Sequence, residues 1–227
     1  MKLSYLFIFL FIFNCLMPKQ LWAIQTVERV WSTLGLNTQI GKFSYQLEPQ
    51  LRVIDQPNLF DQFLTNFSGG YQFSPQWNIA LGTTSVTTAQ NPGFSPSTQE
   101  MRLWQQVTYT QKHFPGFMIR SRIEERKRLD ASAIGYRLRE RITLKKKLTD
   151  SLSLVGFEEF FININQPNWL PTQTVDQNRI LISLDQAASK TLTVGAGYLY
   201  QYIFSNPRQA SHVISLYAQI TLPNEPN

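Results

Sequence analysis

Apolar and polar residues alternate along most of this chain, in segments separated by turn-forming residues. In segment 43–53, Phe43, Tyr45 and Leu47 share one face and polar residues occupy the other. A period of two is the period of a β-strand. About eleven such segments follow one another, most of roughly 10–14 residues, whereas soluble strands usually have about 5–6. A tilted membrane-spanning strand needs about 9–11 residues, so the pattern predicts an all-β, antiparallel transmembrane β-barrel of about 10–12 strands.

The connections between the segments alternate in length. They are short at 74–76, 112–116, 147–151 and 186–190, and longer at 88–97, 165–175 and 205–210. Short periplasmic turns and longer outer loops are typical of outer-membrane barrels. Aromatic residues near the segment ends, such as Tyr71, Trp77 and Trp104, resemble interfacial girdles. Such barrels normally have an even number of strands. We therefore expect the weak segment 26–36 to be a plug or an N-terminal extension. The alternative is that one of the eleven segments contains two strands, or that two of them form a single strand.

Arginine occupies alternate positions in two consecutive segments, 117–128 and 136–144. If both segments turn these side chains inward, six guanidinium groups line one wall and need counter-charges. An ion-pair network that fills the lumen is the favoured interpretation, because small barrels fill their interiors with side chains. The alternative is a pore lining that attracts anions. The predicted lumen or anion-contact residues are Arg120, Arg122, Arg126, Arg137, Arg139, Arg141 and Arg179, and the predicted counter-charges are Glu48, Glu100, Glu124 and Glu159.

Two places break the alternation. In Phe157-Glu158-Glu159-Phe160-Phe161, either register puts a glutamate on the apolar face, and Glu140 poses the same problem opposite the arginines. A bulge in this strand, or a position near the membrane edge, would accommodate these carboxylates.

The N-terminus predicts the compartment. Lys2 precedes an apolar run over 3–16, and Ala23 offers a small residue for cleavage, which indicates a secretory signal peptide over 1–23 followed by one barrel domain over 24–227. The run is shorter than the roughly 20 residues of a transmembrane helix. The expected location is the bacterial outer membrane. Loss of Lys2 and Lys19 would lower the formal charge from +6 to +4, which does not argue for nucleic acid.

Candidate chemistry is sparse. Cys15 lies in the predicted signal peptide, so the mature chain would have no disulfide, thiolate metal site or cysteine nucleophile. His212 follows Ser211, with Ser215 nearby, and a Ser–His pair could serve hydrolysis, but no esterase signature accompanies it. Asp55 with Asp61, or the loop around Asp176, could bind a cation weakly, but such loop acids are usually solvated, and solvation is the expectation here. Zinc, calcium, phosphate-loop and dinucleotide signatures are absent from the sequence.

We therefore expect a non-enzymatic protein without catalytic residues, metal or cofactor. The predicted function is a structural barrel or a narrow anion-preferring pore, and its expected partners are outer-membrane lipid and small anionic solutes. Two alternatives stay open: an outer-membrane lipid or lipopolysaccharide hydrolase, and a soluble periplasmic β-sandwich that binds a ligand.

A series of short motifs runs in a fixed order through most of the predicted mature chain. They are Trp31, the strand from Glu48 to Arg52, the alternating Arg137, Arg139 and Arg141, Glu159-Phe160 with Asn163, Asp176 to Arg179, and Gly197 to Gln201. Together they resemble domain-of-unknown-function family 2490, a family of exported bacterial proteins. The resemblance implies an outer-membrane barrel, and it brings no activity, cofactor or catalytic residue.

Overall fold

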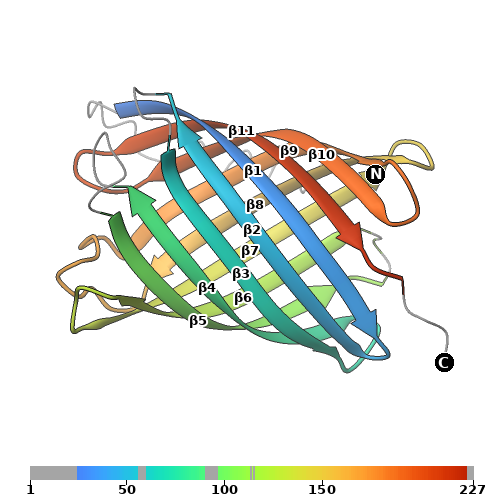
Figure 1. The fold of residues 1–227 in the computed structure, drawn as a ribbon, viewed down its shortest axis with the longest axis horizontal. Coiled ribbons are helices and arrows are strands. Elements are labelled where there is room, and N and C mark those ends of the chain that lie inside the picture. Colours follow the sequence, from blue (N-terminus) through green and yellow to red (C-terminus); the bar gives the residue numbers. More distant parts are fainter. Residues whose placement is uncertain (1–24, 56–59, 90–96, 113, 115, 224–227) are drawn as a thin grey trace.

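The described part of the chain forms eleven β-strands that close into a single barrel (Figure 1). The computed structural model describes residues 25–55, 60–89, 97–112, 114 and 116–223. The predicted signal peptide lies outside the described residues, so its boundary stays a prediction. In chain order the strands are β1 (Gln25–Ile40), β2 (Phe43–Ile54), β3 (Phe60–Gln72), β4 (Trp77–Ala89), β5 (Ser97–Thr110), β6 (Phe117–Arg128), β7 (Ile134–Lys147), β8 (Leu152–Asn163), β9 (Val175–Ala187), β10 (Leu192–Ile203) and β11 (Gln209–Thr221).

Closure of the sheet decides between the predicted architectures. The prediction of an all-β barrel with about 10–12 strands is confirmed, because every strand pairs with a neighbour on each side. The β-sandwich alternative is wrong, since one sheet closes on itself. Within the described ranges, no helix has the length and hydropathy that crossing a membrane requires.

The first and last strands form a seam that the sequence did not predict. β1 pairs with β11 in parallel, from Gln25 opposite Gln209 to Asn37 opposite Thr221, and the two strands point the same way in Figure 1. The other neighbouring pairs are antiparallel. An odd number of strands that reverse direction at each connection forces one parallel pair. Segment 26–36 is therefore a full strand of the barrel wall, and the expectation of a plug or extension is wrong.

The two ends of the barrel differ as expected. Connections 41–42, 73–76, 148–151 and 188–191 lie at one end, here named the short-turn end; connections 129–133, 164–174 and 204–208 lie at the other, the long-loop end. Gly41 adopts a φ of 58°, and positive φ is what the tightest hairpin turns require. β1 begins at the long-loop end and β11 ends at the short-turn end.

The outer surface carries the apolar half of the alternating pattern. Leu81, Ile182 and Ile214 expose 65%, 61% and 57% of their area, although they lie far from the strand ends. The interior is mostly polar and charged, with one apolar cluster of Trp31, Leu181, Leu199 and Val213, against which Phe157 packs. The strands thus present an apolar face outward and a mainly polar face inward.

Four polar residues interrupt the outer face near the middle of β6 to β9. Ser121 Oγ donates to Glu140 Oε2 at 2.7 Å, and Asn178 Nδ2 donates to Glu158 Oε1 at 3.2 Å. Alternation in β8 is regular, so Glu159 points inward while Glu158 stays outside. The expected bulge does not move Glu158 off the outer face; each outward glutamate is instead bonded to a donor from a neighbouring strand.

Two bulges occur elsewhere, and each adds an inward aspartate. Arg52 pairs with Gln62 while Val53 pairs with Phe60, which leaves Asp61 as the extra residue of β3. Asp176 is the extra residue of β9 in the same way, between Val175 and Gln177. Asp61 binds Arg29, and Asp176 is 6% exposed and binds Arg137. The expectation that both are solvated loop acids is therefore wrong.

Candidate functional site

The barrel interior contains a cavity of about 950 Å³, lined by side chains from all eleven strands. Among the described residues, eleven cations face this interior against seven carboxylates, an excess of four positive charges. The cations are Arg29, Arg52, Arg102, Arg120, Arg122, Arg126, Arg137, Arg139, Arg141, Lys145 and Arg179, and the carboxylates are Glu48, Asp61, Glu100, Glu124, Glu159, Asp176 and Asp185.

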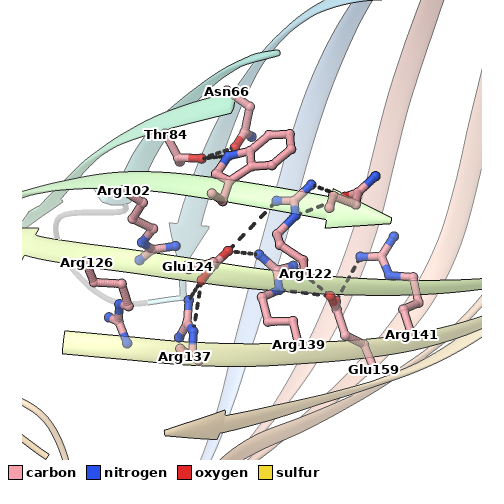
Figure 2. Close-up of polar contacts among 12 residues, drawn as sticks. Asn66, Thr84, Arg102, Arg122, Glu124, Arg126, Arg137, Arg139, Arg141 and Glu159 are labelled. Carbon is pink, nitrogen blue, oxygen red and sulfur yellow. Dashed lines mark hydrogen bonds and ion pairs between the residues drawn. The ribbon is translucent and has the colours of Figure 1, made fainter. Parts of the chain in front are cut away.

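Glu159 of β8 is one centre of this charge network. Its side chain is fully buried and bonds three guanidinium groups, those of Arg120, Arg139 and Arg141. Figure 2 shows the contacts with Arg139 and Arg141. Arg139 Nη2 lies 2.8 Å from Glu159 Oε1, and Arg141 Nη2 lies 2.8 Å from Oε2. Three cations around one carboxylate leave local positive charge even after pairing.

Glu124 of β6 is the second centre. It is also fully buried, and both Arg137 Nη2 and Arg139 Nη1 lie 2.6 Å from its carboxylate oxygens. Arg122 Nη1 is farther away, at 3.8 Å. Arg139 therefore bridges Glu124 and Glu159, so that β6, β7 and β8 share one ion-pair network (Figure 2).

The other predicted counter-charges behave differently from one another. Glu100 binds Arg102 at 2.7 Å and Arg126 at 2.6 Å, the latter through two hydrogen bonds. Glu48 accepts hydrogen bonds from the amides of Gln46 and Asn66, at 3.2 and 3.3 Å. The structure thus brings Glu100, Glu124 and Glu159 together with arginines, whereas Glu48 accepts its hydrogen bonds from neutral amides.

Aromatic rings inside the barrel pack against several of the guanidinium groups. Arg122 lies 3.7 Å from the ring centre of Trp104, whose Nε1 donates to Thr84 Oγ1 at 3.1 Å. A Cβ at Gly82 would lie 2.2 Å from Cζ2 of this indole, so the glycine makes room for it. Trp104 is 4% exposed and lies in the middle of β5. Its prediction as an interfacial girdle residue is therefore wrong.

Arg179 of β9 also faces the cavity, but its surroundings differ. Its guanidinium lies 4.9 Å from the ring centre of Trp31 and 4.6 Å from that of Phe161. Arg52 of β2 approaches the same Trp31 ring, at 3.9 Å. Arg29, Arg52 and Arg102 were not predicted as site residues, although the alternation that revealed the other arginines also puts Arg52 and Arg102 on the polar face.

The residues considered for hydrolysis do not meet. Ser211 is fully buried on the inner side of β11, whereas His212 is exposed on the outer side. His212 Nδ1 bonds the hydroxyl of Tyr198, at 2.5 Å. Neighbouring residues of a strand point to opposite faces, so this Ser–His pair cannot form one site. Within the described residues, no three His, Cys, Asp or Glu side chains are grouped to hold a metal ion.

The fold and interior define a closed β-barrel with an apolar outer wall and an arginine-rich interior. The chain belongs to the family described as protein of unknown function (DUF2490), whose model matches residues 28–212. It is also similar to an uncharacterised protein of Methylorubrum extorquens, with 24% identity over 196 residues that cover 83% of this chain and 85% of that protein. The predicted family membership is thus confirmed, and the family's description names no activity.

Proposed function

We propose that this chain is an outer-membrane barrel whose interior forms a narrow pore that prefers small anions. The apolar outer wall supports the membrane location. Soluble monomers rarely expose contiguous apolar patches larger than a few hundred Å². Here exposed apolar side chains follow one another around the wall; they include Leu51, Phe67, Leu81, Leu103, Ile123, Ile142, Leu154, Ile182, Leu184, Ile214 and Leu216.

Strand length and aromatic placement support the same location. The strands have 12–16 residues, enough to cross a bilayer when tilted. Aromatic rings pair near the short-turn end, as in Phe43–Tyr71 and Trp77–Tyr109, with ring centres 5.1 and 4.8 Å apart. Tyr202 and Phe204 pair near the long-loop end, at 4.8 Å. Rings of this kind at both ends are typical of membrane–water interfaces.

The excess of positive charge around the 950 Å³ cavity is the observation that carries the anion preference. Low-dielectric walls lined by one sign of charge raise the local concentration of the opposite ion. Rings of arginine and lysine are how anion-conducting pores select their solutes. The buried networks around Glu124 and Glu159 narrow the lumen, which favours small solutes.

Planar-bilayer recording tests this function. Protein whose folding has been checked by a heat-modifiable gel shift is expected to give single channels, with a reversal potential in a KCl gradient that favours chloride. Replacing Arg52 and Arg179 by Gln removes two of the four excess charges and is expected to move the reversal potential towards zero. The matched control is Arg128→Gln, because Arg128 is already paired with Asp130 at the long-loop end.

The specific alternative is a purely structural barrel, which the dense ion-pair networks favour. Folded protein that gives no conductance would reject the pore and leave this alternative. A conductance that prefers cations would contradict the proposal that ions pass through the arginine-lined interior.

A further inference from the structure

Two interior cations differ from all the others. Nine of the eleven have a carboxylate oxygen within 4.0 Å. Within the described part of the chain, Arg52 and Arg179 have none. Asp61 and Glu159 interact with them electrostatically, but Asp61 is bonded to Arg29 and Glu159 to three other arginines. Arg52 and Arg179 are therefore the two interior cations without a carboxylate partner, and they account for two of the four excess charges.

These two side chains converge on one place. Both guanidinium groups lie over the Trp31 ring, Arg52 from β2 and Arg179 from β9. Arg52 is held by neutral groups: its Nε donates to Gln50 Oε1 at 2.7 Å and its Nη1 to Gln62 Oε1 at 2.8 Å. Two like charges thus lie against one indole and repel each other, and an anion that contacts both guanidinium groups would offset that repulsion.

Three side chains of this part of the interior carry unpartnered donors, as several other interior arginines also do. Arg29 Nε, Trp31 Nε1 and Arg179 Nε are buried and have no hydrogen-bond partner among the described residues. All three side chains line the cavity, and Trp31 is only 4% exposed. Ser211 Oγ is also buried and unpartnered, and Ser211 lies two strands away from Arg179, because Ser211 pairs with Gln201 and Gln201 pairs with Arg179. Buried donors without a partner are costly, and an oxyanion would satisfy several at once.

We infer that Arg52, Arg179 and Trp31, with the Nε of Arg29, form a binding site for a small dianionic oxyanion of the phosphate or sulfate type. Two positive charges without a carboxylate match a dianion, and planar guanidinium groups match the oxygen geometry of such ions. The closed wall separates the interior from the surrounding lipid, which favours a free ion over a lipid headgroup. This inference deepens the proposed function by naming the class of anion. It rests on that function in one respect, because the ion must be able to enter the barrel interior.

Calorimetric titration of inorganic phosphate into the folded full-length protein in detergent, at constant low ionic strength, tests the site. The wild type is expected to bind phosphate saturably and to give no comparable heat with chloride. Arg52→Gln and Arg179→Gln should each weaken binding roughly tenfold or more, since each removes a charge-assisted contact. Arg179→Lys keeps the charge but loses the planar fork, so an intermediate affinity is expected. Arg128→Gln should bind as the wild type does.

The outcomes separate the site from the pore. Absence of saturable phosphate binding by folded wild type, or unchanged binding by the Arg52→Gln/Arg179→Gln double variant, would overturn the site even if the barrel conducts anions. Phosphate binding that depends on these two arginines, in a barrel without conductance, would support the site and reject the pore. A heat-modifiable gel shift for each variant ensures that lost binding does not reflect lost folding.

Discussion

Glu159 shows at the residue scale how this interior tolerates so many like charges. A buried ion pair gains little over an apolar pair of the same shape, but removing one partner leaves an uncompensated charge in a poorly solvated place. Glu159 has three such partners, and arginine keeps its charge under all ordinary conditions. Removing this carboxylate should therefore lower the free energy of unfolding more than removing any one of the arginines around it.

Glu159→Gln is expected to lower the free energy of unfolding by about 3–5 kcal/mol, because three guanidinium groups lose their shared counter-charge. Urea unfolding in lipid vesicles measures this change. Adding Arg141→Gln should restore part of the loss, since Glu159 is the carboxylate to which Arg141 is paired. The matched control is Glu140→Gln, which loses one hydrogen-bonded carboxylate from the outer face. Equal losses in the two single variants would contradict the special role of Glu159.

Alternation in the sequence was enough to put most interior arginines on one face, because a regular strand keeps its parity from end to end. Asp61 and Asp176 escaped this reasoning, since each is the extra residue of a bulge and its parity is reversed there. The position of Trp104 was mispredicted for another reason. Its large apolar ring suggests an outward position, whereas it lies inside the barrel, where the guanidinium group of Arg122 stacks on it. Such cross-strand contacts depend on register, which the sequence does not state.

At the scale of the strand, the two bulges repeat one arrangement. Each lies near the long-loop end, and each turns an aspartate and the following glutamine inward, Asp61 with Gln62 and Asp176 with Gln177. Each aspartate then binds an arginine of a different strand, on β1 or β7. The bulges thereby supply two of the seven interior carboxylates, without which the positive excess would be larger.

β1 is the strand whose role the sequence described least well. Its alternation is weak because Val30 and Leu34 face outward together with Thr26, Glu28 and Ser32. Its pairing with β11 joins residues more than 180 positions apart. Local pattern carries no information about such a contact, so the parallel seam and the odd strand count became visible only in the closed barrel.

Disulfide cross-linking tests the direction of the seam. Thr26→Cys with Ala210→Cys, and Leu36→Cys with Ile220→Cys, are expected to cross-link, because each pair is in register in the parallel arrangement. An antiparallel pairing would instead favour position 26 with 220 and 36 with 210. These two swapped pairs are the controls, and they should stay reduced because each separates its cysteines by about ten residues, roughly 33 Å along the strands. Cross-linking of the swapped pairs alone would contradict the seam.

At the scale of the whole molecule, the odd number of strands puts the start of β1 and the end of β11 at opposite ends of the barrel. A barrel with an even number of strands would bring both to the same end. Gln25 bonds the backbone of Arg208 at the long-loop end, and Leu222 bonds Asn37 at the short-turn end. If the barrel spans the outer membrane with its long loops outside, these two positions face different compartments.

Cysteine labelling on intact cells with a membrane-impermeant maleimide is expected to show this difference. Gln25→Cys should label together with Asp130→Cys of the long-loop end, and Leu222→Cys should stay unlabelled together with Asp150→Cys of the short-turn end until the cells are opened. These four positions are exposed, so access and not burial decides the result. Asp130 and Asp150 define the two sides independently of β1 and β11. The contradicting outcome is equal labelling of Gln25→Cys and Leu222→Cys while Asp130→Cys and Asp150→Cys still differ. The start of β1 and the end of β11 would then lie on the same side of the membrane. Eleven membrane-spanning strands do not allow that arrangement.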